Sequence, residues 1–566
     1  MSNEFSQNPE TPRQLADHFV EALCDLDPTV GTMLGMRPDE DRMPDYSPTA
    51  LNARAELGQR ILNQLDELEA AAGEQGFNEL EQRCADLLRD RIGVELEVHE
   101  SGENLRVVRN IASPIHTARS LFLLMPQETD QNWAVIARRL GQFSASYASL
   151  RETLEEGRRR GITSAPLQVE TVIGQLQEWL EGDETWFHQF AAKGPEALSR
   201  QLQEAADDAA AAVAEMRDYL QQTYLPAAEG TPNAVGRERY LLNTRRFMGA
   251  SIDPEEVYAW GWAEYKRIYA EMCELAEQIK PGSTPVEAMA WLDKNGRRVE
   301  GVEEVRSWLQ QMMDTAIEEL DGTHFDIAEP IKTVEAMIAP SGSAAAPYYT
   351  RPAVDFSRPG RTWLPTLGRT EFPIYDLVST WYHEGVPGHH LQFAQWAYKS
   401  KDLSVYQTTL GSSSGMTEGW ALYSERLMDE LGYFDPEERM GYLDAQILRA
   451  IRVVIDLGMH LELTVPEDSP IGAGQTWTRE LAEEFLNAHT GSPAEFVTSE
   501  IIRYLGWPGQ AISYKLGERA WLNGREAARK ATESRGESFD LKAWHMQALS
   551  IGALGLDDLE ETLAKL

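Results

Sequence analysis

The chain has 566 residues, of which 42% are hydrophobic and 25% charged, so its composition is typical of a folded protein and not of a disordered or fibrous one. Asp and Glu number 91 and Lys and Arg 52, which gives a formal net charge of −39. Such a surface repels phosphate backbones and anionic lipids, so we expect no nucleic acid partner and no membrane partner. The composition indicates no particular oligomeric state.

The cysteines are few and scattered. Cys24, Cys84 and Cys273 form no CxxC pair, which argues against a disulfide framework or a thiolate zinc site and suits a reducing compartment. The first residues lack the basic start and the apolar run of a secretory signal, and no stretch of about 18 apolar residues occurs. From these features we expect a cytoplasmic protein.

Helical patterns dominate the first half of the chain. Apolar residues recur at helical spacing through residues 1–240, for example at Ile61, Leu65 and Leu68. A second helical block follows, in which Asp253 is predicted to cap a helix that has Pro254 in its first turn. We expect residues 1–240 to form a helical region that walls a cleft and residues 241–566 to form a catalytic region. No linker is long or flexible enough to separate them cleanly, so we expect one continuous structural unit.

The sequence changes character between residues 327 and 357, where prolines, small residues and short β-branched stretches replace the helical pattern. This segment is predicted to form a small β-sheet. Helical patterns return after a turn at residues 357–360 and continue almost to the end of the chain. The fold class is therefore predicted to be mainly α, a large multi-helix fold with a small sheet beside the helix that carries the chemistry.

The strongest chemical signal is the segment YHEGVPGHHLQ, which begins at Tyr382. It opens like the zinc-peptidase motif HExxH, in which two histidines four residues apart hold the metal and the glutamate between them is the general base. His383 and Glu384 match that motif. The fifth position, however, is Pro387, which cannot bind a metal.

Two histidines can replace the missing ligand. Proline removes a helical hydrogen bond and Gly388 tolerates unusual dihedral angles, so a bulge that absorbs two residues would bring His389 to the second ligand position. In a regular helix, at about 100° per residue, His390 returns to within about 20° of His383 and His389 lies about 120° away. We favour His389, because proline and glycine are the residues that most readily distort a helix.

A third ligand is expected from the next helix, which is predicted over residues 416–427 and carries two carboxylates seven residues apart. Glutamate-ligand zinc peptidases leave a fourth position open for water. Glu418 is the better candidate because it stands near the start of the helix, and Glu425 is the alternative. A carboxylate at the position of Glu418 could instead serve only to stabilise the helix dipole.

Four segments together resemble the DUF885 family: YYTRPAVDFSRPG, HEGVPGHHLQ, TEGWALYSERL and RYLGWPGQAISYKLGE. The resemblance extends over roughly residues 345–525. The family is similar to gluzincin metallopeptidases, which implies His383, His389 and Glu418 as zinc ligands and Glu384 as the base. Many of its members look like exported lipoproteins, whereas the start of this sequence shows no signal.

Other residues could support the site from further away. His390 could bind substrate or orient a ligand, and Arg503 or Tyr514 could stabilise an oxyanion or hold a substrate carboxylate. One later helix carries a stripe that either orients a ligand histidine or forms a buried ion-pair network that fixes helix packing. Its members are Arg449, Arg452, Asp456 and His460.

The sequence thus predicts a Zn²⁺-dependent hydrolase that acts on short peptides, with Glu384 taking a proton from an attacking water. An edge strand of the small sheet would hold an extended peptide, and the two helical halves would wall a channel. Two alternatives remain: hydrolysis of a non-peptide amide or ester as a small-molecule substrate, and a helical binding protein that has lost its metal site.

Overall fold

The computed structural model describes residues 9–182, 184–339 and 346–566. Helices account for 67% of the chain and strands for 4%, so the predicted mainly α class with a small sheet is confirmed. Among the described helices, none has the length and apolar character needed to cross a membrane.

The chain folds into two compact units. Unit 1 comprises Met1–Val235 and the short segment Ile502–Trp507, and unit 2 comprises Gly236–Ile501 and Pro508–Leu566. The division that we expected at residues 240 and 241 falls inside the first helix of unit 2, α12. The return of residues 502–507 to unit 1 has no signal in the sequence.

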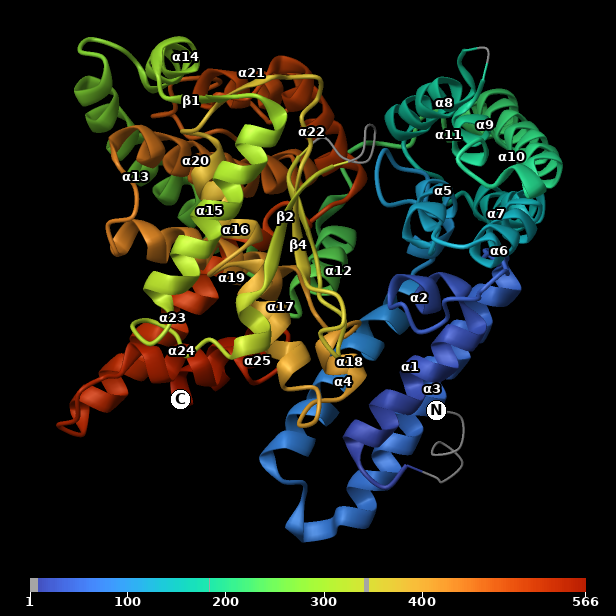
Figure 1. The fold of residues 1–566 in the computed structure, drawn as a ribbon, viewed down its shortest axis with the longest axis horizontal. Coiled ribbons are helices and arrows are strands. Elements are labelled where there is room, and N and C mark those ends of the chain that lie inside the picture. Colours follow the sequence, from blue (N-terminus) through green and yellow to red (C-terminus); the bar gives the residue numbers. More distant parts are fainter. Residues whose placement is uncertain (1–8, 183, 340–345) are drawn as a thin grey trace. The chain divides into compact units, whose positions relative to one another are not determined.

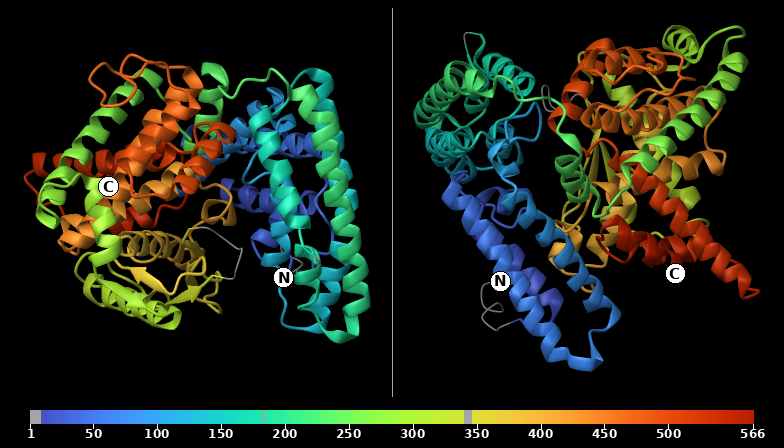
Figure 2. Two further views of the ribbon diagram at one scale, coloured as in Figure 1. Left: turned by 90° about the horizontal axis from the view of Figure 1, so that it is seen from above. Right: turned by 180° about the vertical axis from the view of Figure 1, so that it is seen from behind.

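In the residues that the structure describes, the regular elements of unit 1 are all helices (Figures 1 and 2). They are α1 (Pro12–Leu26), α2 (Pro28–Met33), α3 (Pro48–Ala72), α4 (Glu79–Glu100), α5 (Pro114–Leu124), α6 (Asp130–Leu140), α7 (Phe143–Arg160), α8 (Pro166–Leu180), α9 (Trp186–Ala191), α10 (Ser199–Tyr219) and α11 (Leu225–Ala228). A buried aromatic core joins α5, α6, α7 and α9, with Phe143 stacked on Phe122 and packed edge-on against Phe187. The apolar faces of these amphipathic helices therefore pack against one another and form a core within unit 1.

Unit 2 contains the remaining helices and the described strands. The helices are α12 (Gly236–Met248), α13 (Pro254–Ile279), α14 (Pro285–Asn295), α15 (Val302–Leu320), α16 (Leu377–Glu384), α17 (His389–Tyr398), α18 (Val405–Thr408), α19 (Ser414–Glu430), α20 (Pro436–Leu461), α21 (Arg479–His489), α22 (Ala494–Gly506, whose end belongs to unit 1), α23 (Ser513–Ser534), α24 (Leu541–Leu549) and α25 (Leu556–Lys565). The predicted cap of α13 is confirmed, because the Asp253 side chain accepts from the backbone N–H groups of Glu255 and Glu256.

The small sheet has three strands in the order β2-β4-β3. β2 (Val334–Ile338) runs parallel to β4 (Gly360–Leu364), and β3 (Tyr348–Thr350) runs antiparallel to β4. The sheet thus extends beyond residue 357, because the central strand β4 follows the turn that we took as the start of helical sequence. A separate pair joins β1 (Arg298–Glu300) to β5 (Glu371–Pro373). Helix α15 packs on β2 and α17 on β4, which places the sheet beside the candidate site (Figure 1).

Helices α19 and α23 approach each other through glycines. A Cβ atom added at Gly419 would lie 2.4 Å from the backbone carbon of Gly517, and one added at Gly517 would lie 2.0 Å from the carbonyl oxygen of Gly415. Any side chain here would meet backbone, which cannot move aside as a flexible side chain can. These glycines therefore fix the separation of α19 and α23.

We predict that Gly419→Ala destabilises unit 2 by an amount at the upper end of about 1–3 kcal/mol, because the added methyl group forces two backbones apart. The measurement is the free energy of unfolding in urea. Gly174→Ala is the control, since Gly174 lies in α8 with open space around it. The control variant should be more stable by about 0.5–1 kcal/mol. Equal effects of the two substitutions would contradict the packing argument.

Candidate metal centre

The segment that carries the histidines is two helices and not one. α16 ends at Glu384 and α17 begins at His389, with a cis peptide bond between Val386 and Pro387. The N–H of Gly388 donates to the carbonyl of Tyr382 at 3.0 Å, and the N–H of His390 donates to the carbonyl of Gly385 at 3.0 Å. Our expectation of a bulge within a continuous helix is corrected: the helix stops and a new one starts.

Two side chains of α19 hold this break. Trp420 Nε1 donates to the carbonyl oxygen of Pro387 at 2.9 Å. Ser424 Oγ lies 3.2 Å from the same oxygen and shares its one proton between it and the carbonyl oxygen of Trp420, at 2.8 Å. Glycine is required at position 388, because a Cβ there would lie 2.0 Å from the carbonyl oxygen of His383. The side chains of α19 thus provide hydrogen bonds for the carbonyl group of Pro387, which has no partner within the interrupted helix.

The break brings three candidate ligands together. One side-chain atom each from His383, His389 and Glu418 all lie within 4.8 Å of one another. Glu418 Oε2 lies 3.3 Å from His383 Nε2 and 3.6 Å from His389 Nε2. The two imidazole rings are 4.8 Å apart and nearly perpendicular, so their edges converge on the glutamate.

The three residues fit a metal ion. Glu418 Oε2 is buried and, among the described residues, has no partner that meets hydrogen-bond geometry. A cation between the three side chains would satisfy that oxygen and both imidazole nitrogens. Two histidines and one glutamate form a common protein ligand set for catalytic Zn²⁺, which leaves a further position open.

His383 is oriented by a second glutamate. Its Nδ1 lies 2.7 Å from Glu425 Oε1, and Ser379 Oγ donates to the other oxygen of Glu425. An ionised carboxylate only accepts, so Nδ1 carries a proton, and Nε2, which faces Glu418, is the nitrogen that a metal would bind. The sequence offers Glu425 only as an alternative ligand. The structure places it behind the histidine, and the signal that could have found it is the need of a ligating histidine for a carboxylate on its other nitrogen.

The electrostatics of the cluster come from burial and from close opposite charges. Burial raises the pKa of Glu384 above its usual range, and the charges of His383 and His389 only partly offset this. Burial opposes protonation of His383, but Glu418 and Glu425 outweigh it and raise the pKa of His383 to about 10. The positive charge of Arg449 on α20 favours the ionised form of Glu384 and of Glu425. Three carboxylates, those of Glu384, Glu418 and Glu425, therefore share a buried site, and a bound cation would favour their ionised forms.

His390 has a different role from its neighbour. Its Nδ1 is 2.9 Å from the Tyr349 hydroxyl and its Nε2 is 2.7 Å from the carbonyl oxygen of Ile331. Burial lowers the pKa of His390 to about 4, so the ring is neutral and both of its nitrogens are occupied. His390 therefore ties the sheet region to α17 and is not placed as a ligand.

The other candidates lie outside the three-residue cluster. His460 on α20 is buried, 3.7 Å from Asp456, which accepts from the Tyr240 hydroxyl. Tyr514 on α23 lies under the guanidinium of Arg452, which pairs with Glu500. Arg503 lies in the segment assigned to unit 1 and its guanidinium packs over the ring of Tyr504.

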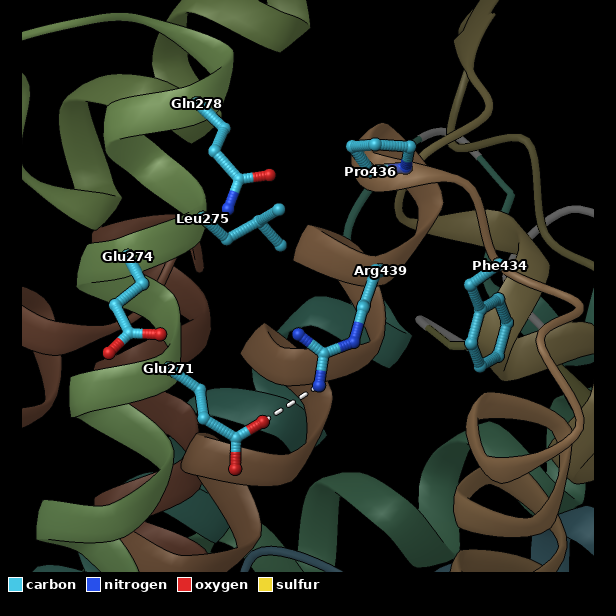
Figure 3. Close-up of a pocket in the computed structure, with 7 residues that line it drawn as sticks. All are labelled: Glu271, Glu274, Leu275, Gln278, Phe434, Pro436 and Arg439. Carbon is cyan, nitrogen blue, oxygen red and sulfur yellow. Dashed lines mark hydrogen bonds and ion pairs between the residues drawn. The ribbon is translucent and has the colours of Figure 1, made fainter.

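A pocket of about 370 Å³ between α13 and α20 includes no residue of the cluster. Figure 3 shows Arg439 reaching across it to Glu271, to which it is ion-paired at 2.7 Å. Arg439 also pairs with Asp429, so its charge is already balanced.

The sequence profile of a family described as "Bacterial protein of unknown function (DUF885)" matches residues 28–563. The chain belongs to the DUF885 family. No match is found among curated proteins.

Two solved structures resemble this DUF885 protein over nearly its whole length. The putative lipoprotein from Colwellia psychrerythraea is 25% identical, with a TM-score of 0.80, and the similarity covers 98% of this chain and 99% of that one. A putative lipoprotein of unknown function from Shewanella oneidensis is 17% identical, with a TM-score of 0.72 and the same coverage.

These two structures contradict the cytoplasmic location that we expected, because both are described as lipoproteins. Scattered cysteines suit a reducing compartment but do not require one, so they were weak grounds for a location. The expectation is withdrawn.

We predict that Glu425→Gln in this DUF885 protein lowers Zn²⁺ affinity by about 10- to 100-fold, because the histidine loses the carboxylate that orients it. Competition with a fluorescent chelator measures the affinity. Glu430→Gln on the same helix is the control, since Glu430 is partly exposed and pairs with Arg525. Unchanged affinity in Glu425→Gln would show that the contact only supports packing.

Proposed function

We propose that this chain is a zinc-dependent peptidase of the gluzincin type that acts on short peptides. The observation that carries the proposal is the convergence of His383, His389 and Glu418 within 4.8 Å, with Glu384 close enough to interact electrostatically with all three. The set combines the ligand types of a catalytic zinc site with a neighbouring carboxylate that is not a ligand.

Different residues are proposed to bind the metal and to orient its ligands. His383, His389 and Glu418 would hold Zn²⁺, and Glu425 would keep the His383 ring in position. When bound, zinc supplies a Lewis acid that polarises the scissile carbonyl and lowers the pKa of water to about 7.

Glu384 is the proposed general base. It follows His383 at the end of α16, it is buried, and burial raises its pKa above the usual range of a glutamate. A carboxylate so tuned can accept a proton from the attacking water and then donate it to the leaving amine. Both transfers use the same carboxyl group, so no further acid is needed.

The sheet supports an extended substrate. β3 is an edge of the sheet, and the hydroxyl of Tyr349 within it is bonded to His390, the residue next to a proposed ligand. Edge strands offer unpaired backbone groups to which an extended peptide can add. This feature favours peptides over compact small molecules.

We predict that Glu384→Gln retains zinc and loses peptide hydrolysis by two or more powers of ten, about the contribution of a general base. The measurements are zinc content and turnover of a peptide library, each before and after chelation. A parallel panel of small amides and esters tests the non-peptide alternative. Wild-type turnover in Glu384→Gln would remove Glu384 from the mechanism, and a wild-type protein that takes up no zinc would favour a binding protein.

A matched pair of variants tests the ligand assignment. We predict that His389→Ala loses zinc and activity together, whereas His390→Ala keeps its zinc, because both nitrogens of His390 are already hydrogen-bonded. Elemental analysis of the purified variants gives the zinc stoichiometry. The assignment is wrong if His390→Ala empties the site and His389→Ala leaves it filled.

A further inference from the structure

Arg351 directly follows the edge strand β3. Its guanidinium carbon lies 3.7 Å above the centre of the Phe393 ring, and its Nη1 donates to the carbonyl oxygen of Thr408 at 2.6 Å. A guanidinium has five N–H donors, so most of its hydrogen-bonding capacity remains for a ligand. Stacking on an aromatic ring fixes the plane of these donors.

Phe393 connects this arginine to the metal centre. Its ring stacks on His389, with centres 5.5 Å apart and planes within 13°. Phe393 and Arg351 are both partly exposed, so neither side chain is sealed from solvent. One aromatic ring therefore contacts both a proposed zinc ligand and a cationic side chain.

Arg351, unlike Arg361 on the neighbouring strand, has no acidic neighbour among the residues that the structure describes. Although the chain has 91 acidic residues, no carboxylate in the described ranges lies within ion-pair distance of Arg351. Arg361, on the neighbouring strand, pairs with Glu335. Burial lowers the pKa of Arg351 to about 10, which still leaves it charged at neutral pH. A partly buried cation without an anion loses solvation and gains little, unless a ligand supplies the negative charge.

We propose that Arg351 binds the terminal carboxylate of the peptide substrate, so that the protein cleaves short peptides near their carboxyl end. The planar fork of a guanidinium matches a carboxylate, with two parallel N–H···O bonds. A fixed separation between this fork and the metal centre would set which peptide bond is cut. The inference rests on the proposed peptidase function and adds the substrate class, peptides with a free carboxyl terminus.

Three peptides of otherwise identical sequence test the inference: a free acid, its carboxyl-terminal amide, and an amide whose last residue is glutamate. Hydrolysis is measured with the zinc-loaded wild type, and binding is measured calorimetrically with zinc-loaded Glu384→Gln. We expect the free acid to exceed both amides by about 10- to 100-fold in kcat/KM and in affinity, the usual worth of a charged hydrogen-bonded pair. The inference is overturned if the plain amide matches the free acid in kcat/KM and affinity. It is also overturned if the glutamate amide matches the free acid, because the protein would then recognise a side-chain carboxylate.

Arg351→Gln should bring the free acid down to the level of the amide, mainly through KM, and leave the amide unchanged. Arg358→Gln is the matched control, because Arg358 is exposed in the same loop. An equal loss for both peptides in Arg351→Gln would mean a packing role and would overturn the inference. A protein that binds the free acid through Arg351 but hydrolyses no peptide would overturn the peptidase proposal and leave carboxylate recognition standing.

Discussion

The hydrogen bond from Trp420 to the carbonyl oxygen of Pro387 is the interaction on which the site depends. An interrupted helix exposes backbone groups that lose their intrahelical partners, and in a buried position these must be paired elsewhere. Trp420 and Ser424 pair the carbonyl at the break, and Trp420 itself is held in the core against Trp521. The hydrophobic core of unit 2 thus stabilises a backbone path that a helix alone would not take.

One helix, α19, makes the remaining connections. It carries Glu418 to the histidines, places Glu425 behind His383, and is itself fixed by the glycine contact with α23. The proposed ligand Glu418, the orienting carboxylate of Glu425 and the two side chains that pair the carbonyl at the break therefore belong to one helix. Sites built in this way can hold their geometry before any ion is bound.

Much of the fold and the cluster could be predicted from the sequence, because helical periodicity and the spacing of histidines are local signals. The choice between His389 and His390 could be argued from Pro387 and Gly388, but the roles of the two rings depend on partners far away in the chain. Tyr349 and Ile331 occupy His390, and no spacing rule connects them to it.

Other features escaped the sequence for the same reason. β4 is short and follows a turn, so its central place in the sheet depends on pairing with two distant strands. Arg351 stands inside a segment that carries the family resemblance, yet its position over Phe393 arises only in the folded chain. Tertiary contacts of single side chains leave no periodic pattern.

His383 spans two carboxylates of one helix, with Nδ1 at Glu425 and Nε2 at Glu418. Seven residues make almost two turns, a rise of about 10.5 Å on one face of α19, and the imidazole fits between the two acids. The helix therefore fixes the distance between the two carboxylates that contact the ring. Loops before and after α19 can change length without altering this spacing. One residue inserted between the two acids would turn one by about 100° relative to the other, so that they point about 80° apart and leave the ring with only one.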